Sequence, residues 1–276
     1  MKRKVKTKVK GFRTTDGAGV KLVRVLGNLT TKEFDPILML DSFDSINPDD
    51  YTAGFPMHPH RGIETISYVS RGKMVHRDSL GNEAGISDGE VQWMNSGSGI
   101  MHEEMVPAAE RLLGVQLWLN LPAKDKMSKP SYNSIKNEDI KEIEIEGGKI
   151  RLLAGKYGEH EGYKGDYLSM DYYDIHLNAD AEVTLTMEED DSVMVFTLLG
   201  DVYIDGEHIE EKTAVKLTEG DSLTIKNGNE KAQVLYMNSR ALNEPVAWAG
   251  PIVMNTQEEL QKAFLELRSN TFIKET

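Results

Sequence analysis

The chain of 276 residues contains no cysteine, which excludes disulfides, thiolate metal ligands and thiol redox chemistry. It has no run near the roughly 18 apolar residues of a membrane span, and no apolar segment follows its basic start as in a secretory signal. A net charge of −13 argues against nucleic-acid binding, because that affinity comes largely from neutralising phosphates. We therefore expect a cytoplasmic, monomeric protein that binds neither nucleic acid directly nor membranes.

The basic first ten residues predict a strand rather than a nucleic-acid arm. Lysines at positions 4, 6, 8 and 10 alternate with Val5, Thr7 and Val9, which is typical of a strand with one face in water. Lysine-rich strands are found at sheet edges, where they discourage aggregation. We expect an exposed edge strand here.

Most of the remaining chain indicates short strands separated by glycine-containing turns, such as Arg71-Gly72 and Asp88-Gly89. Helical periodicity is almost absent, so the pattern predicts an all-β protein built of barrels or sandwiches. The length suits two domains. The change to polar and acidic composition over residues 122–140 places the junction there.

Three of the seven histidines belong to two pairs of potential metal ligands, and the members of each pair are two residues apart. His58 and His60 are two residues apart, and His102 and Glu104 repeat that spacing. On a strand, residues i and i+2 point to the same face, about 6.6–7 Å apart. Two such pairs on facing strands could bring three imidazoles and one carboxylate to one point. Imidazole suits iron, copper, nickel or zinc, and histidines combined with a carboxylate resemble the non-heme iron oxygenase sites that keep coordination positions open.

An internal repeat indicates that the chain contains two related units. Residues 66–75 align with 194–203, and residues 88–91 align with 219–222. Counted from these anchors, the second copies of the four candidate ligands are Thr186, Glu188, Gln233 and Leu235. The second copy has none of the histidines, so we expect one metal ion, bound by the first unit.

Several sequence blocks resemble the pirin family of bicupins. They are His58-Pro-His60-Arg-Gly-Ile-Glu64-Thr, Asp78-Ser-Leu-Gly-Asn, Val91-Gln-Trp-Met94, Gly97-Ser-Gly-Ile-Met-His102-Glu-Glu104-Met, Val115-Gln-Leu-Trp-Leu-Asn-Leu-Pro122 and Pro251-Ile-Val-Met-Asn-Thr256. The resemblance implies two cupin-type β-barrels in tandem. We expect a metal-binding cupin domain at 1–130, a cupin domain without ligands at 131–245, and a tail with a short helix at 246–276.

The carboxylate ligand has two candidates. The general cupin pattern favours Glu64, which shares its parity with His58 and His60, so spacing alone allows either acid. The pirin resemblance implies Glu104 as the ligand beside the three histidines. Glu64 would then orient an imidazole N–H as an outer partner. Glu103 has the opposite parity and should point away from the metal.

The resemblance also implies a chemistry. Pirins are similar to cupin quercetinases, which open a flavonol ring with O₂. We expect a dioxygenase acting on a small aromatic substrate, with one divalent metal, foremost Fe(II), with Mn, Ni, Co, Cu or Zn as alternatives, and with Glu104 as ligand and base. One alternative is a regulator whose metal state alters binding to a transcription factor or metabolic enzyme. A second is a purely structural metal, which predicts saturated coordination.

Other residues receive simpler interpretations. His76, His160, His176 and His208 have no partner at ligand spacing and are interpreted as structural or surface residues. Arg61 is either a charge beside the site or a surface ion pair.

A helix is expected after residue 255. Thr256-Gln-Glu-Glu259 is a capping box. Leu260, Ala263, Phe264 and Leu267 follow it as one apolar stripe, which should pack on a barrel exterior.

Overall fold

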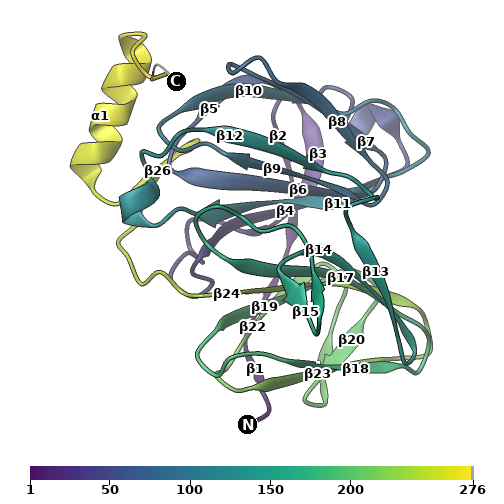
Figure 1. The fold of residues 1–276 in the computed structure, drawn as a ribbon. Helices are drawn as coiled ribbons and strands as arrows, with labels where there is room; N and C mark the ends of the chain where they lie inside the picture. Colours follow the sequence, from purple (N-terminus) through teal and green to yellow (C-terminus); the bar gives the residue numbers. More distant parts are fainter. Residues whose placement is uncertain (275–276) are drawn as a thin grey trace. The chain divides into compact units, whose positions relative to one another are not determined.

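The computed structural model describes residues 1–274, which form two β-rich units (Figure 1). The N-terminal unit comprises residues 13–31, 37–136 and 242–276, and the C-terminal unit comprises residues 1–12, 32–36 and 137–241. The prediction of an all-β bicupin with a C-terminal helix is confirmed.

Two antiparallel sheets build the N-terminal unit. The larger sheet has the order β12 (Ser131–Ile135), β9 (Glu90–Asn95), β6 (Ile63–Arg71), β11 (Leu112–Asn120), β4 (Ile37–Ser45), β3 (Val20–Leu26) and β2 (Phe12–Asp16). The smaller sheet has the order β5 (Phe55–His60), β10 (Ile100–Met105), β7 (Lys73–Asp78) and β8 (Glu83–Ser87). Short 3₁₀ helices lie at Pro48–Asp50 and Ala123–Asp125.

The C-terminal unit repeats this plan. Its larger sheet has the order β1 (Val5–Lys10), β22 (Thr213–Leu217), β19 (Ser192–Leu199), β24 (Ala232–Ser239), β17 (Met170–Leu177), β14 (Gly148–Ala154) and β13 (Lys141–Ile145). The smaller has the order β18 (Glu182–Thr186), β23 (Ser222–Asn227), β20 (Val202–Ile204) and β21 (Glu207–Ile209). A separate pair joins β15 (Lys156–Tyr157) to β16 (His160–Glu161).

The matching sheet orders correct part of the repeat alignment. β5 and β10 occupy the places that β18 and β23 occupy in the other unit. The counterpart of the His102 strand is therefore β23, whereas the sequence alignment placed it at Gln233 and Leu235 on β24. The error arose because residues 219–222 were aligned with the turn before β9, although they precede β23.

The core of the C-terminal unit explains why a second metal site is not expected there. β18 contributes Val183 and Leu185 to an apolar cluster, and β23 contributes Leu223 and Ile225. These four side chains are buried. The strands that correspond to the histidine strands thus present aliphatic groups, which cannot ligate a metal.

Non-local strand pairing changes the predicted domain boundaries. β1 was assigned to the metal-binding domain at 1–130, but it pairs with β22 at the edge of the C-terminal sheet. Its alternating exposure matches the predicted edge strand. Residues 246–276 were predicted as a tail that packs on the barrels, and the structure groups residues 242–276 with the N-terminal unit.

The C-terminal tail folds as a hairpin followed by one helix. β25 (Ala247–Ala249) pairs with β26 (Ile252–Met254), and α1 spans Gln257–Arg268 with the predicted capping box at Thr256. Leu260 and Ala263 are buried. We expected them to pack on a barrel exterior, but they pack against this hairpin.

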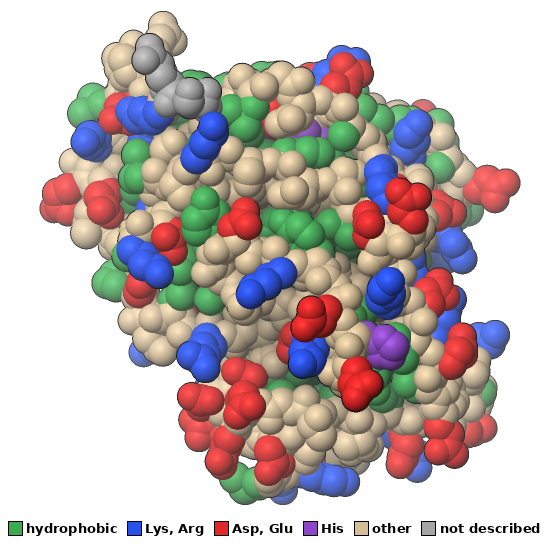
Figure 2. All heavy atoms as spheres, in the orientation of Figure 1, with side chains coloured by type: hydrophobic (Ala, Val, Ile, Leu, Met, Phe, Trp, Pro, Cys, Tyr) green, Lys and Arg blue, Asp and Glu red, His purple; other side chains and the backbone are tan. Residues whose placement is uncertain are grey.

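On the face drawn in Figure 2, acidic and basic side chains are interspersed. Within residues 1–274, the single α-helix is too short and too polar to cross a membrane.

Candidate metal centre

The three predicted histidines come together because β5 and β10 are antiparallel neighbours. His58 lies directly opposite His102, and His60 lies opposite Ile100. The ligand nitrogens of His58, His60 and His102 all lie within 4.8 Å of one another. The predicted convergence of the three imidazoles is therefore found in the structure.

Two of the three imidazoles are oriented by a backbone carbonyl at the Nδ1 atom. Nδ1 of His58 lies 2.8 Å from the carbonyl oxygen of Pro56, and Nδ1 of His60 lies 3.0 Å from that of Pro251. A carbonyl oxygen only accepts, so both Nδ1 atoms carry the proton and both Nε2 atoms keep a lone pair. These contacts select the tautomer that suits a metal ligand.

The Nε2 atoms are placed as if around a cation. Nε2 of His58 and Nε2 of His60 are 3.1 Å apart, yet neither can donate to the other when both Nδ1 atoms carry the protons. Nε2 of His102 is buried and has no hydrogen-bond partner among residues 1–274. A shared cation would satisfy all three lone pairs, so the donor set fits a metal ion.

Protonation is a poor substitute for that cation. Burial lowers the pKa of His60 to about 3, and the neighbouring His58 acts in the same direction while the Pro251 carbonyl opposes it. Burial lowers the pKa of His102 well below its usual value, and His60 and His58 add to the effect. Near neutral pH these two rings are therefore unprotonated, as metal binding requires.

The two candidate carboxylates form hydrogen bonds with side chains other than the three histidines. Glu104 is buried, and its oxygens accept hydrogen bonds from the side-chain amides of Gln92 and Gln116, the latter at 2.7 Å. Glu64 accepts a 3.0 Å hydrogen bond from the Trp93 indole, and its predicted contact with an imidazole N–H stays a prediction. Neither carboxylate belongs to the converging group, so Glu104 as ligand remains a prediction.

Glu103 follows its parity prediction. It is partly exposed and its carboxylate lies 3.5 Å from the Arg77 guanidinium on the neighbouring strand.

One histidine of the site was missed. His76 was interpreted as structural or surface, but it is fully buried and its Nδ1 lies 3.4 Å from Nδ1 of His102. It forms a His-x-Asp pair with Asp78 at the spacing of the ligand pairs. That spacing was the available signal, but only the register of β7 on β10 shows its proximity to His102.

His58 and His60 form part of the wall of a cavity of about 550 Å³, which is also lined by Phe55, Trp118 and Trp248. The Trp118 ring lies 5.0 Å from the His60 ring, and the Trp248 ring lies 5.4 Å from Trp118. This volume suits a drug-sized organic molecule, and the aromatic rings suit a flat one.

A charged group lines the same cavity. Arg24 donates to both oxygens of Asp41 at 2.9 and 2.7 Å, and to Asp16 at 2.6 Å. Hydrogen bonding to Asp41 raises the pKa of Arg24, while burial raises the pKa of Asp41. With the acids ionised the trio carries one net negative charge, and its oxygens can accept further hydrogen bonds from a ligand.

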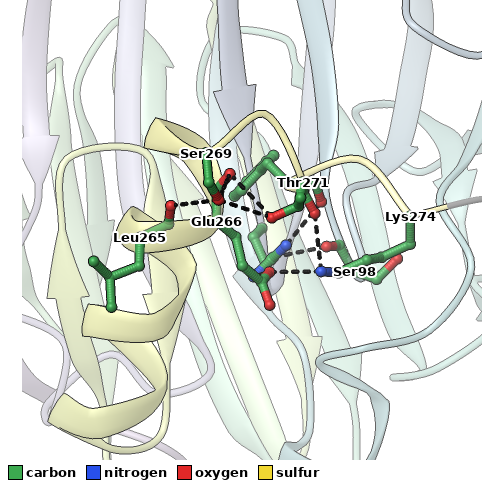
Figure 3. Close-up of polar contacts among 8 residues, drawn as sticks. Ser98, Leu265, Glu266, Ser269, Thr271 and Lys274 are labelled. Atoms are coloured by element: carbon green, nitrogen blue, oxygen red, sulfur yellow. Dashed lines mark hydrogen bonds and ion pairs between the residues drawn. The ribbon is translucent and has the colours of Figure 1, made fainter.

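Arg61 tethers the C-terminal helix beside the site, and this excludes the surface ion pair considered from sequence. It is 2% exposed and donates to the Ser98 carbonyl at 2.7 Å, to Glu266 at 2.7 Å and to the Phe272 carbonyl at 2.8 Å. Figure 3 shows Ser98, Glu266 and Lys274 turned toward one another here. Because Arg61 follows His60 directly, the tail is fixed next to a candidate ligand.

The fold and the site together define a bicupin with a histidine cluster that could hold a metal ion. The Pirin family model matches residues 19–119, and the model of the Pirin C-terminal cupin domain matches residues 172–273. The chain belongs to the pirin family, as the sequence blocks predicted.

Similar proteins cover nearly the whole chain. A Pseudomonas aeruginosa protein named provisionally as a quercetin 2,3-dioxygenase is 39% identical, over 94% of each chain. Human pirin is 35% identical, over 97% of this chain and 93% of its own. The crystal structure of a quercetin 2,3-dioxygenase from Acinetobacter baumannii superposes with a TM-score of 0.90 at 30% identity, covering 99% of both chains.

Proposed function

We propose that this protein is a metal-dependent dioxygenase that acts on a flavonol-type substrate with O₂. The observation that carries the proposal is the convergence of three lone-pair nitrogens, two of which belong to His58 and His60 in the wall of a cavity of about 550 Å³ that also has aromatic walls. A purely structural metal would not require such a cavity. The names of similar proteins, which include quercetin 2,3-dioxygenases, also support this proposal.

The residues of the chain have distinct roles in this proposal. His58, His60 and His102 hold the metal, foremost Fe(II), through their Nε2 atoms. When bound, such an ion supplies open coordination positions for a substrate oxygen and O₂. Glu104 is proposed as the fourth ligand and as the base for the flavonol hydroxyl proton. The two-residue spacing from His102 supports this role, because residues i and i+2 of a strand share a face; the register of β10 is regular with β7 over both residues but shifts between them against β5.

The cavity wall positions the substrate. Trp118 and Trp248 offer ring faces against which a planar polyphenol can stack, at a gain of about 0.5–1.5 kcal/mol per ring pair. Asp41 and Asp16 accept hydrogen bonds, so they favour a ligand that carries hydroxyl groups.

The test measures oxygen uptake and flavonol loss by iron-loaded protein. His58→Ala removes one of three proposed ligands and should lower the rate more than 100-fold. His176→Ala is the control, because His176 lies in the C-terminal unit and is paired with Asp174. It should keep the wild-type rate. Equal rates for wild type and His58→Ala would refute the proposed function.

A further inference from the structure

His76 holds a position that none of the proposed roles uses. It lies on β7, which pairs with the histidine strand β10, and its exposed fraction is 0%. Its ring stacks on Tyr132 with centroids 4.1 Å apart and planes 11° apart. The ring is thus fixed in a plane and cannot turn freely.

Both nitrogens of this ring face a polar partner. Nε2 lies 2.8 Å from a carboxylate oxygen of Asp78, and Nδ1 lies 3.4 Å from Nδ1 of His102, at the long end of hydrogen-bond range. Asp78 is itself held by the backbone N–H of Leu80 at 2.9 Å, and by Asn82 through its backbone at 3.1 Å and its side-chain amide at 2.9 Å. Asp78, the residue of this hydrogen-bond series farthest from His102, is therefore held by the turn that follows it.

The direction of the hydrogen bonds follows from the anchored end. The Asp78 carboxylate only accepts, so Nε2 of a neutral His76 carries the proton and donates it. Nδ1 of His76 is then an acceptor, which requires Nδ1–H on His102 as the donor. The remaining nitrogen of His102, Nε2, is left with its lone pair. This is the atom that is buried without a hydrogen-bond partner in the part of the chain described.

We propose that His76 and Asp78 are positioning residues that fix the tautomer and ring angle of His102, so that its Nε2 is presented to a metal. The inference rests on the metal site of the proposed function but not on the oxygenase activity. The tautomers of His58 and His60 are fixed in the same way by backbone carbonyls. His102 depends on a side chain instead, and it is therefore the ligand that a single substitution can misorient.

Two polar substitutions separate this role from a structural one. In His76→Asn, the side-chain carbonyl can take the place of Nδ1 and still accept from His102. In His76→Gln, the amide takes the place of Nε2, so it can still reach Asp78 but not His102. A structural role would be disturbed by both changes, whereas the proposed role is lost only in His76→Gln.

A matched control exists in the C-terminal unit. His176 and Asp174 form the same His–Asp contact at 2.8 Å with the same two-residue spacing on β17, and among the described residues the converging histidines lie in the other unit. His176→Gln should leave metal binding unchanged.

The experiment titrates metal-free protein with Co(II) and records the Kd and the proton NMR spectrum in water. The wild type should show exchangeable, hyperfine-shifted Nδ1–H signals from the three bound imidazoles. We expect His76→Gln to raise the Kd 10–100-fold, the usual effect of removing an outer partner, and to shift or broaden one of these signals. His76→Asn should stay within about threefold of wild type, as expected where the hydrogen bond is kept.

The outcomes distinguish the two proposals. An unchanged Kd and spectrum in His76→Gln, or equal losses in His76→Gln and His76→Asn, would overturn the positioning role alone. A wild-type protein that binds no Co(II) would overturn the metal site and, with it, the proposed function.

Discussion

Replacing Arg61 by methionine should release α1 and the tail from the N-terminal unit. Methionine keeps an unbranched stem of similar length but removes three hydrogen bonds and the guanidinium that lies 4.2 Å from the Phe272 ring centre. Breaking a buried ion pair costs about 3–5 kcal/mol. Glu266 is 16% exposed and keeps Lys274 at 2.7 Å, so we expect the low end, about 3 kcal/mol.

Hydrogen exchange followed by mass spectrometry measures this loss locally. About 3 kcal/mol corresponds to a fall of about 100-fold in the protection of the amides of α1, if the helix opens as one unit. Arg268→Met is the control, since Arg268 is exposed on the same helix and its substitution should change protection by less than about 0.5 kcal/mol. Unchanged protection of α1 in Arg61→Met would refute the idea that this guanidinium holds the helix.

Three further results are expected. Glu104→Gln should weaken Co(II) binding more than about 10-fold while Glu64→Gln changes it less than threefold; the opposite ranking would make Glu64 the carboxylate ligand. In urea titrations of metal-free protein, His60 alone should account for a loss of about 2 kcal/mol between pH 7 and pH 5, measured as the difference from His60→Phe. The unfolded chain takes up a proton at His60 below about pH 6.5, whereas the folded chain, with a pKa of about 3, does not, so stability falls as the pH falls. A flat profile, or an equal slope in His60→Phe, would contradict this account. Gly62→Ala should destabilise the folded protein by more than about 3 kcal/mol, because φ is +79° and a Cβ would lie 1.9 Å from the carbonyl oxygen of Val253 in the tail. Gly81 has a similar φ of +86° but lies in open space, so Gly81→Ala should cost only about 1 kcal/mol. Equal costs in thermal melts would show that the close approach does not matter.

Local signals in the sequence predicted the local structure well. The alternating lysines gave the edge strand β1, and the Thr256 capping box gave the start of α1. The two-residue spacing of His58 and His60 placed both rings in one cluster. In each case the deciding geometry lies within a few neighbouring residues, which is why periodicity alone was sufficient.

Features set by distant pairing were missed. β1 joins β22 across some 200 residues, and no pattern within either strand names its partner. The role of His76 depends on its register against β10, and the repeat alignment slipped by one strand because glycine-containing turns resemble one another. The carboxylate contacts of Glu104 likewise depend on Gln92 and Gln116, which come from two other strands.

The discontinuous N-terminal unit has a consequence for how the protein is made. His58, His60 and His102 leave the ribosome early, but the Pro251 carbonyl that holds His60 follows only after all of residues 137–241 have been synthesised. At translation speeds of about 5–20 residues per second, the histidine cluster waits several seconds or more for its last support. The His60 ring therefore cannot take up its final orientation until the tail has been synthesised.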